Sequence, residues 1–284
     1  MAIPVIDFSK INGEEREKTL SEIAKACEEW GFFQLVNHGI PLELLNKVKK
    51  LASDCYKTER EEAFKTSTPV KLLNELLEKN SGEKLENVDW EDVFTLLDHN
   101  QNEWPSNTSG LKETMVEYRE EVRKLASKMM EVMDENMGLP KGYIKKAFNE
   151  GMEDGEETAF FGTKVSHYPP CPRPELVNGL RAHTDAGGVP MPNAIVINTG
   201  DQIEVLSNGR YKSAWHRVLA REEGNRRSIA SFYNPSYKAA IGPAAAEEGS
   251  EKKYPKFVFG DYMDVYANQK FMPKEPRFLA VKTL

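Results

Sequence analysis

The first half of the chain has the hydrophobic periodicity of helices, with apolar residues recurring every three or four positions. Leu20, Ile23 and Cys27 mark the apolar face of one such segment, and Gly31 ends it. The pattern predicts helices over residues 13–31, 41–65, 67–84 and 111–140. Short apolar segments between them predict strands over residues 3–8, 32–41 and 88–99.

The second half has the pattern of short strands separated by turn residues. The strands are expected within residues 161–172, 179–185, 193–200, 213–220, 226–234 and 253–262. Between two of them, Ile203 and Leu206 have helical spacing and predict a helical turn before Asn208. A mainly helical part therefore precedes a mainly β part, which predicts an α+β fold. The expected regions are residues 1–110, 111–160 and 161–284.

Composition and charge exclude several classes of protein. The 284 residues are 39% apolar and 29% charged, with a formal net charge of −7. A negative balance argues against nucleic acid and anionic membranes, which attract basic surfaces. No apolar run is long enough for a transmembrane helix, and the N-terminus lacks the pattern of a signal peptide. Three widely spaced cysteines indicate a reduced, cytoplasmic protein rather than a disulfide framework.

A candidate metal site begins at His183 and Asp185, which share one face if they lie on a strand. His216, in the strand candidate "WHRVLA", is the expected third ligand. Two histidines and one carboxylate form the facial triad that binds Fe(II) and leaves positions open for substrate and O2. The alternative is a chance H-x-D beside structural histidines. His38, His99 and His167 are expected to be structural.

A second pair, Arg226 and Ser228, follows at the same i, i+2 spacing. If residues 213–220 and 226–234 form a hairpin, both side chains share the face of His216. Ser228 would then lie ~7 Å and Arg226 ~13 Å along from that histidine, at ~3.3 Å per residue. A guanidinium and a hydroxyl at this reach would hold a small carboxylate near the metal. The alternative is a surface arginine beside a buried serine.

Six segments together resemble a known family over nearly the whole chain: "IPVIDF", "WGFFQLVNHGIP", "YPPCPRPEL", "LRAHTDAGG", "GDQIEVLSNGRYKSAWHRV" and "SIASFYNP". They are similar to the plant non-haem Fe(II) dioxygenases that usually consume 2-oxoglutarate. "FGTKVSHYPPCP", which contains Lys164, and "KEPRF" (274–278) resemble the 1-aminocyclopropane-1-carboxylate oxidase branch.

The resemblance implies a double-stranded β-helix, or jelly roll, with flanking helices and a C-terminal helix. It implies Fe(II) bound by His183, Asp185 and His216, and oxidation of 1-aminocyclopropane-1-carboxylate to ethylene. O2 would be the cosubstrate, ascorbate the electron donor, and bicarbonate or CO2 an activator. Catalytic roles would fall to Lys164, Arg226 and Ser228. Binding of substrate or cosubstrate would involve Tyr168, Arg181, Arg226, Ser228, Lys274 and Arg277.

The chain departs from this family between Asp185 and His216, where relatives have a longer stretch. About 25 residues are missing, enough for two or three strands of ~5–6 residues with their turns. An incomplete jelly roll is therefore expected, with an apolar face uncovered. Exposing ~1,000 Å² of apolar surface at ~25 cal/mol per Å² would cost ~25 kcal/mol. Two alternatives follow: a catalytically impaired variant, or a 2-oxoglutarate dioxygenase with another small substrate, against which Lys164 and "KEPRF" argue.

Overall fold

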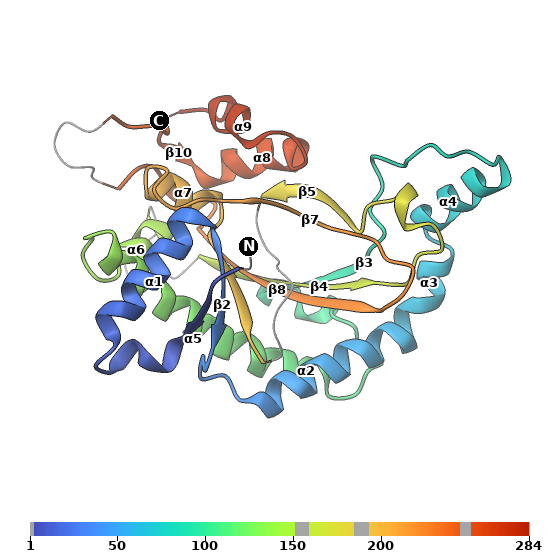
Figure 1. The fold of residues 1–284 in the computed structure, drawn as a ribbon, viewed down its shortest axis with the longest axis horizontal. Coiled ribbons are helices and arrows are strands. Elements are labelled where there is room, and N and C mark those ends of the chain that lie inside the picture. The colour runs from blue at the N-terminus through green and yellow to red at the C-terminus, as the bar shows by residue number, and fades with distance from the viewer. Residues whose placement is uncertain (1–2, 151–158, 185–192, 245–250, 284) are drawn as a thin grey trace.

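The computed structural model describes residues 3–150, 159–184, 193–244 and 251–283 (Figure 1). Its first half is mainly helical, as the periodicity predicts. After strand β1 (Val5–Asp7) and a 3-10 turn, the elements up to Phe148 are α1 (Arg16–Glu29), β2 (Phe32–Val36), α2 (Leu42–Cys55), α3 (Glu61–Lys65), α4 (Thr68–Glu78), β3 (Asp92–Leu96), α5 (Leu111–Asn136) and α6 (Tyr143–Phe148). Gly31 ends α1 with a φ of +69°, and a side chain there would collide with the carbonyl oxygen of Lys212.

The second half supplies the remaining strands and three further helices. They are β4 (Phe160–Tyr168), β5 (Leu180–Thr184), β6 (Ile195–Asn198), α7 (Asp201–Leu206), β7 (Trp215–Val218), β8 (Arg226–Asn234), β9 (Ala240–Ile241), β10 (Phe257–Val258), α8 (Phe259–Gln269) and α9 (Lys274–Ala280). Within the described residues they form sheets ordered β1-β2-β6 and β3-β4-β8, and the pairs β5-β7 and β9-β10. The described part of the chain therefore mixes helices and strands as an α+β protein.

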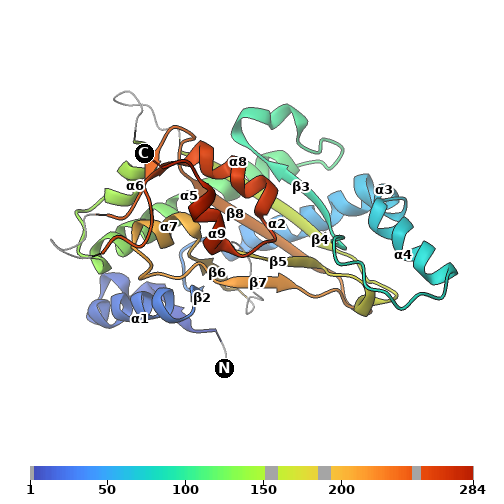
Figure 2. The same cartoon turned by 90° about the horizontal axis from the view of Figure 1, so that it is seen from above.

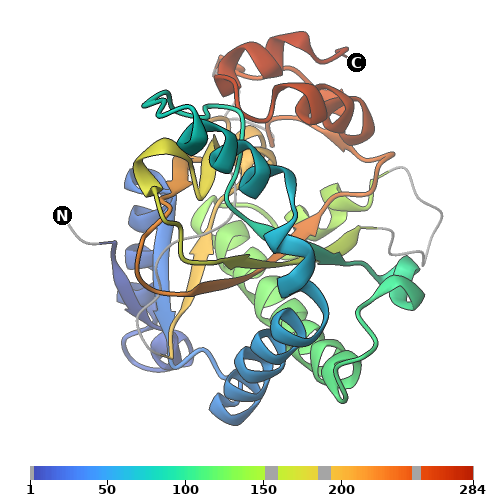
Figure 3. The same ribbon diagram turned by 90° about the vertical axis from the view of Figure 1, so that its right-hand side faces the viewer.

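The β5–β7 pair forms one layer and the β3–β4–β8 sheet another (Figures 1 and 2). Helices α2 and α5 cover the far face of the β3–β4–β8 sheet, where Thr163 meets Ser231 and Ser231 meets Tyr118 of α5. Alternate residues of β4 and β8 point the other way, toward the β5–β7 pair. Figure 3 shows β1, β2 and α1 at one side and the C-terminal helices at the top.

Two strand predictions are wrong. Residues 253–262 are expected to form a strand, but only Phe257 and Val258 do so, and α8 begins at Phe259. Buried Phe259 and Tyr262 have the i, i+3 spacing of a helix. The hairpin between residues 213–220 and 226–234 also does not form, because β7 pairs with β5 and β8 pairs with β4. The connection between β7 and β8 crosses from one layer to the other, as connections in jelly rolls do.

The strands around the expected gap are incompletely covered. All nine residues of β8 and all four of β6 are partly exposed, whereas most of β4 is buried. Trp215 on β7 is 41% exposed and Leu219 just after it is 60% exposed. Among the described residues, β6, β7 and β8 each have a strand on one side only. This exposure agrees with the expectation that the jelly roll lacks the strands that relatives have between residues 185 and 216.

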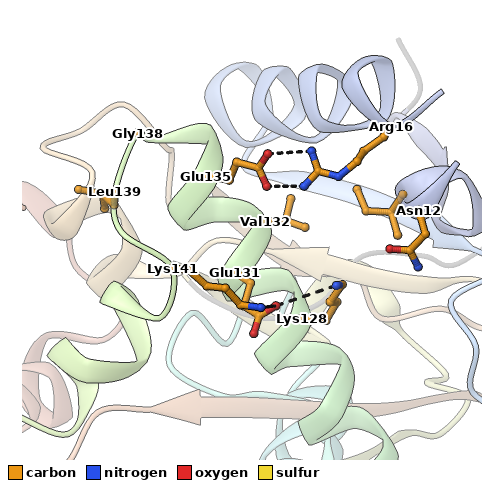
Figure 4. A pocket seen from close by; sticks show the side chains of 10 residues that line it. Asn12, Arg16, Lys128, Glu131, Val132, Glu135, Gly138, Leu139 and Lys141 are labelled. Carbon is orange, nitrogen blue, oxygen red and sulfur yellow. Dashed lines mark hydrogen bonds and ion pairs between the residues drawn. The ribbon is translucent and has the colours of Figure 1, made fainter. Parts of the chain in front are cut away.

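Helix α1 is fastened to α5 by a bidentate ion pair between Arg16 and Glu135, with N–O distances of 2.7 and 2.5 Å (Figure 4). The pair borders a surface cavity of about 500 Å³. Lys128 and Lys141 on its rim both pair with Glu131, so each charged residue that lines the cavity has an ion-pair partner. None of the predicted site residues lies in this cavity.

No helix in the described ranges combines the length and apolar character needed to cross a bilayer.

Candidate active site

Strands β5 and β7 place His183 directly opposite His216, with ring centroids 4.3 Å apart. Each ring is oriented by its own backbone. Nδ1 of His183 lies 2.8 Å from the carbonyl oxygen of Arg181, and Nδ1 of His216 lies 3.0 Å from that of Ala214. A carbonyl can only accept, so Nδ1 carries the proton and the lone pair is on Nε2. Metal-binding histidines are usually oriented in this way, by a hydrogen bond from the ring nitrogen that does not bind the metal.

Burial keeps the first of these rings neutral. His183 is 2% exposed. Its burial lowers the pKa of His183 to about 3, and the charges of His216, Lys270 and Lys164 act in the same direction. A metal binds the neutral imidazole, so the ring is held in the form that a ligand needs.

Asp185, the predicted carboxylate ligand, lies outside the described residues. Within the described ranges, no three histidine, cysteine or acidic side chains come together as a metal site. Two imidazoles with matching tautomers, and a carboxylate two residues after one of them, are a donor set that suits Fe(II). The histidine pair therefore fits an iron site, and the ligand roles stay a prediction.

Two aromatic walls flank the histidines, and sequence reasoning missed both. The ring of Phe32 lies edge-on to His216 with centroids 5.2 Å apart. Phe271 lies 6.3 Å from His183 and also carries the guanidinium of Arg181, 3.8 Å above its ring. These contacts join residues far apart in the chain, so no local spacing could have revealed them.

Strands β4 and β8 bring four predicted residues to one face. Lys164 and Tyr168 point the same way from β4, and Arg226 and Ser228 lie opposite Tyr168 and Ser166 on β8. The guanidinium of Arg226 lies 5.2 Å from the centre of the Tyr168 ring. The predicted R-x-S pair thus shares a face, but with Tyr168 rather than along a hairpin with His216.

Glu91, just before β3, is a member of this face that sequence reasoning missed. Its side chain is 6% exposed, and one carboxylate oxygen lies 2.9 Å from Nζ of Lys164. The phenol of Tyr168 donates to the same carboxylate at 2.6 Å. Burial raises the pKa of Tyr168, and the charge of Glu91 adds to that effect, so the phenol stays a donor. The available signal was the acidic sequence "VDWED", whose alternation predicts only a strand.

Arg181 lies on β5 two residues before His183, and both side chains lie against the ring of Phe271. Asp89 holds Arg181, with Nε and Nη2 of the guanidinium each 3.1 Å from one of its oxygens. Asp89 also accepts from the backbone N–H of Arg181 at 2.7 Å. The predicted pocket arginine is thus engaged by an acidic partner and stacked on Phe271.

Lys274 and Arg277 of α9 lie in buried ion pairs with helix α7. Nζ of Lys274 is 2.6 Å from Glu204 and 2.7 Å from the carbonyl oxygen of Ser213. Arg277 has a fully buried side chain and donates from Nη1 to Asp201 at 2.7 Å and to Thr184 at 3.4 Å. All of these partners belong to the protein itself. One of them, Thr184, lies between the predicted ligands His183 and Asp185 in the sequence.

Replacing Asp201 by asparagine is expected to destabilise the protein by about 3 kcal/mol or more, because it leaves the buried charge of Arg277 without its counter-charge. The measurement is the urea unfolding free energy. Asp264→Asn, on the nearby helix α8, is a matched control with the same charge change, and it should shift stability by less than about 0.5 kcal/mol. An unchanged Asp201→Asn protein would contradict the importance of the ion pair.

The three other histidines lie away from the pair. His167 is 5% exposed and bonds to Asn225 on the helix-covered face of β4, opposite to Lys164. His38 accepts from the backbone N–H of Ile40 at 3.2 Å. His99 is exposed. The structural roles expected for them stay a prediction.

Family comparisons place the chain among oxygenases. Residues 3–114 match the family described as non-haem dioxygenase in morphine synthesis, N-terminal, and residues 187–235 match the 2OG-Fe(II) oxygenase superfamily. The solved structure of JOX2 in complex with 2OG, Fe and JA is 29% identical, with a TM-score of 0.79 over 99% of this chain and 89% of that one. The dioxygenase for auxin oxidation in rice, 18% identical, has a TM-score of 0.70 over 94% of this chain and 95% of that one, and supports the fold. The predicted jelly roll is confirmed by these neighbours.

Curated relatives are more specific. The chain is 86% identical to 1-aminocyclopropane-1-carboxylate oxidase 5 of Arabidopsis thaliana and 64% identical to 1-aminocyclopropane-1-carboxylate oxidase of Musa acuminata, in each case over 100% of both chains. The Arabidopsis alignment spans 310 positions and this chain has 284 residues, so about 26 positions have no counterpart here. The expected loss of about 25 residues agrees with this difference. The chain therefore belongs to the 1-aminocyclopropane-1-carboxylate oxidase family of non-haem Fe(II) oxygenases.

Proposed function

We propose that this protein oxidises 1-aminocyclopropane-1-carboxylate to ethylene with Fe(II) and O2. The proposal depends on one observation: the chain is 86% identical over its full length to a curated enzyme, 1-aminocyclopropane-1-carboxylate oxidase 5 of Arabidopsis thaliana. The paired imidazoles of His183 and His216, both protonated on Nδ1, support an iron-dependent reaction. Ascorbate as reductant and bicarbonate or CO2 as activator are part of the proposal.

Each side chain has a proposed role. His183, Asp185 and His216 hold the iron, which supplies the means to activate O2 when it is bound. Arg226 and Ser228 receive a carboxylate or bicarbonate, because a guanidinium and a hydroxyl on neighbouring positions of one face bind such anions well. Tyr168 orients Arg226 and donates a hydrogen bond, and Lys164 contributes positive charge near His183.

In this proposal Lys274 and Arg277 act indirectly, by holding backbone and side-chain groups near the site. Arg277 fixes Thr184, and Lys274 fixes the start of the segment that leads into β7, through the carbonyl oxygen of Ser213. Both thereby support the strands that carry the histidines. Arg181 lines the site beside Phe271.

The proposed partner is a small molecule, with no role for nucleic acid or membrane, and the proposed location is the cytoplasm. The net charge of −7 supports the first point. Cys27, Cys55 and Cys171 are all buried thiols without disulfides, which supports a reducing compartment.

A catalytically impaired variant is the second candidate, because β6 and β8 are incompletely covered. A 2-oxoglutarate dioxygenase is the third, because the related JOX2 structure contains 2OG. We expect ethylene when purified protein is mixed with Fe(II), ascorbate, bicarbonate and 1-aminocyclopropane-1-carboxylate, measured in the headspace by gas chromatography. Turnover that requires 2-oxoglutarate supports the third candidate. Iron binding without ethylene, or a broad melt without iron binding, supports the second.

A further inference from the structure

Three carboxylates of the acidic segment, residues 88–92, each hold one cation. Asp89 holds Arg181, Glu91 holds Lys164, and Asp92 holds Arg60. Arg181 and Lys164 belong to the candidate active site, so both enter it as neutralised pairs. The Glu91–Lys164 pair has exposed side-chain fractions of 6% and 22%, which weakens screening by water.

Arg226 differs from these two cations. Its contact within the described part of the chain is with the ring of Tyr168, and no carboxylate there pairs with it. The face of β4 and β8 that carries the R-x-S pair therefore offers one unneutralised guanidinium. A ligand with one carboxylate finds its partner there, whereas a second carboxylate would need Lys164, which Glu91 already holds.

We propose that Glu91 is a specificity-determining residue that makes the site select a zwitterionic amino acid over a dicarboxylate such as 2-oxoglutarate. The inference rests on the proposed function and deepens it. Because Glu91 engages Lys164, a second negative group finds no free cation there, and the buried carboxylate can itself accept a hydrogen bond from an ammonium group. A hydrogen bond from Tyr168, whose ring Arg226 contacts, fixes the carboxylate in place.

The test compares Glu91→Gln with a neighbouring control, Asp92→Asn. Glutamine keeps an acceptor for Lys164 and Tyr168, so the fold is retained while the charge is removed. Asp92 loses the same charge one residue away, but it lies opposite His167 on β4 and pairs with Arg60 on the helix-covered face. Binding of 1-aminocyclopropane-1-carboxylate and of 2-oxoglutarate is measured separately by titration calorimetry on Fe(II)-loaded protein without oxygen.

Removing one negative charge from the site should tighten 2-oxoglutarate binding about tenfold and weaken amino-acid binding about threefold in Glu91→Gln. Asp92→Asn should leave both affinities within about twofold of the wild type. A second variant, Lys164→Gln, leaves Glu91 without its cation, so it should weaken 2-oxoglutarate binding further. These opposite signs separate a change of selectivity from a general loss of structure.

The inference is overturned if Glu91→Gln changes both affinities by the same factor, leaves both unchanged, or behaves like Asp92→Asn. If Glu91→Gln does not fold, Lys164→Gln decides the question: weaker 2-oxoglutarate binding with unchanged or tighter amino-acid binding supports the inference, and an equal loss of both affinities overturns it. A wild type that fails to bind the amino acid contradicts the proposed function. In that case, a gain of 2-oxoglutarate binding in Glu91→Gln still supports the selectivity, and no gain overturns it.

Discussion

Fe(II) affinity is expected to fall by at least a factor of about 100 when His183 is replaced by alanine, because two remaining ligands rarely hold iron. Asp185→Ala should have the same effect. In the structure, His183 is buried against His216, and its ring is already oriented by the carbonyl oxygen of Arg181. Anaerobic titration with Fe(II), or the absorption of bound Co(II), measures the loss directly.

The matched control is His99→Ala, which removes an exposed imidazole away from the histidine pair. Its iron affinity should equal that of the wild type. A cavity left at a buried position also lowers stability, so melting curves of the His183→Ala protein must show that it is folded at the assay temperature. Tight iron binding by a folded His183→Ala or Asp185→Ala protein would contradict the ligand assignment.

Restoring the segment that the Arabidopsis relative has and this chain lacks should raise the melting temperature by about 10 °C or more. The segment would be inserted after Val189, where the sequence departs from its relatives. Covering even about 200 Å² of apolar surface along β6 and β8 adds about 5 kcal/mol at ~25 cal/mol per Å². For a chain of this size, each kcal/mol corresponds to about 2–4 °C.

A glycine–serine insert of the same length at the same position is the control, because it lengthens the loop without supplying strands. It should leave the melting temperature unchanged or lower it slightly, since longer loops cost little entropy. Calorimetric melts of the three proteins decide the matter. Equal melting curves for the native, restored and control chains would mean that the remaining strands already form a complete core.

Local patterns predicted the parts of the fold that local interactions determine. The periodicity that predicts a helix over residues 111–140 corresponds to α5, whose buried residues include Met115 and Met129. The i, i+2 spacing of Arg226 and Ser228 correctly placed both on one face. Alternation is a property of one strand, so it can be inferred from one segment. The fold class and the family are confirmed, and the division at residues 110 and 160 stays a prediction.

Strand partners could not be predicted in the same way. The sequence favoured a hairpin between neighbouring strands, but β7 pairs with β5, whose residue His183 lies 33 positions before His216. In a jelly roll, sequence neighbours often belong to opposite sheets. The pairing that brings the histidines together is therefore a property of the whole chain.

The charge balance of the site was also beyond the sequence. Lys164 was expected to be catalytic, and Arg181, Lys274 and Arg277 were expected to bind substrate or cosubstrate, yet each has a carboxylate partner. Those carboxylates come from residues 89, 91, 201 and 204, none of which was singled out. The sequence shows which cations a site contains. Only the structure shows which of them already pair with a carboxylate of the protein and which can still bind an anionic ligand.

The contact of Arg277 with Thr184 has a consequence for biosynthesis. Strand β5 is held in part by a helix that follows it by some ninety residues, through Arg277, Asp201 and Tyr262. A nascent chain emerging from the ribosome lacks that helix until synthesis has passed residue 280, although both histidines are exposed long before. If the two histidines bind iron as proposed, the site is completed only after translation, and iron bound earlier would meet imidazoles on a strand that Arg277 does not yet hold.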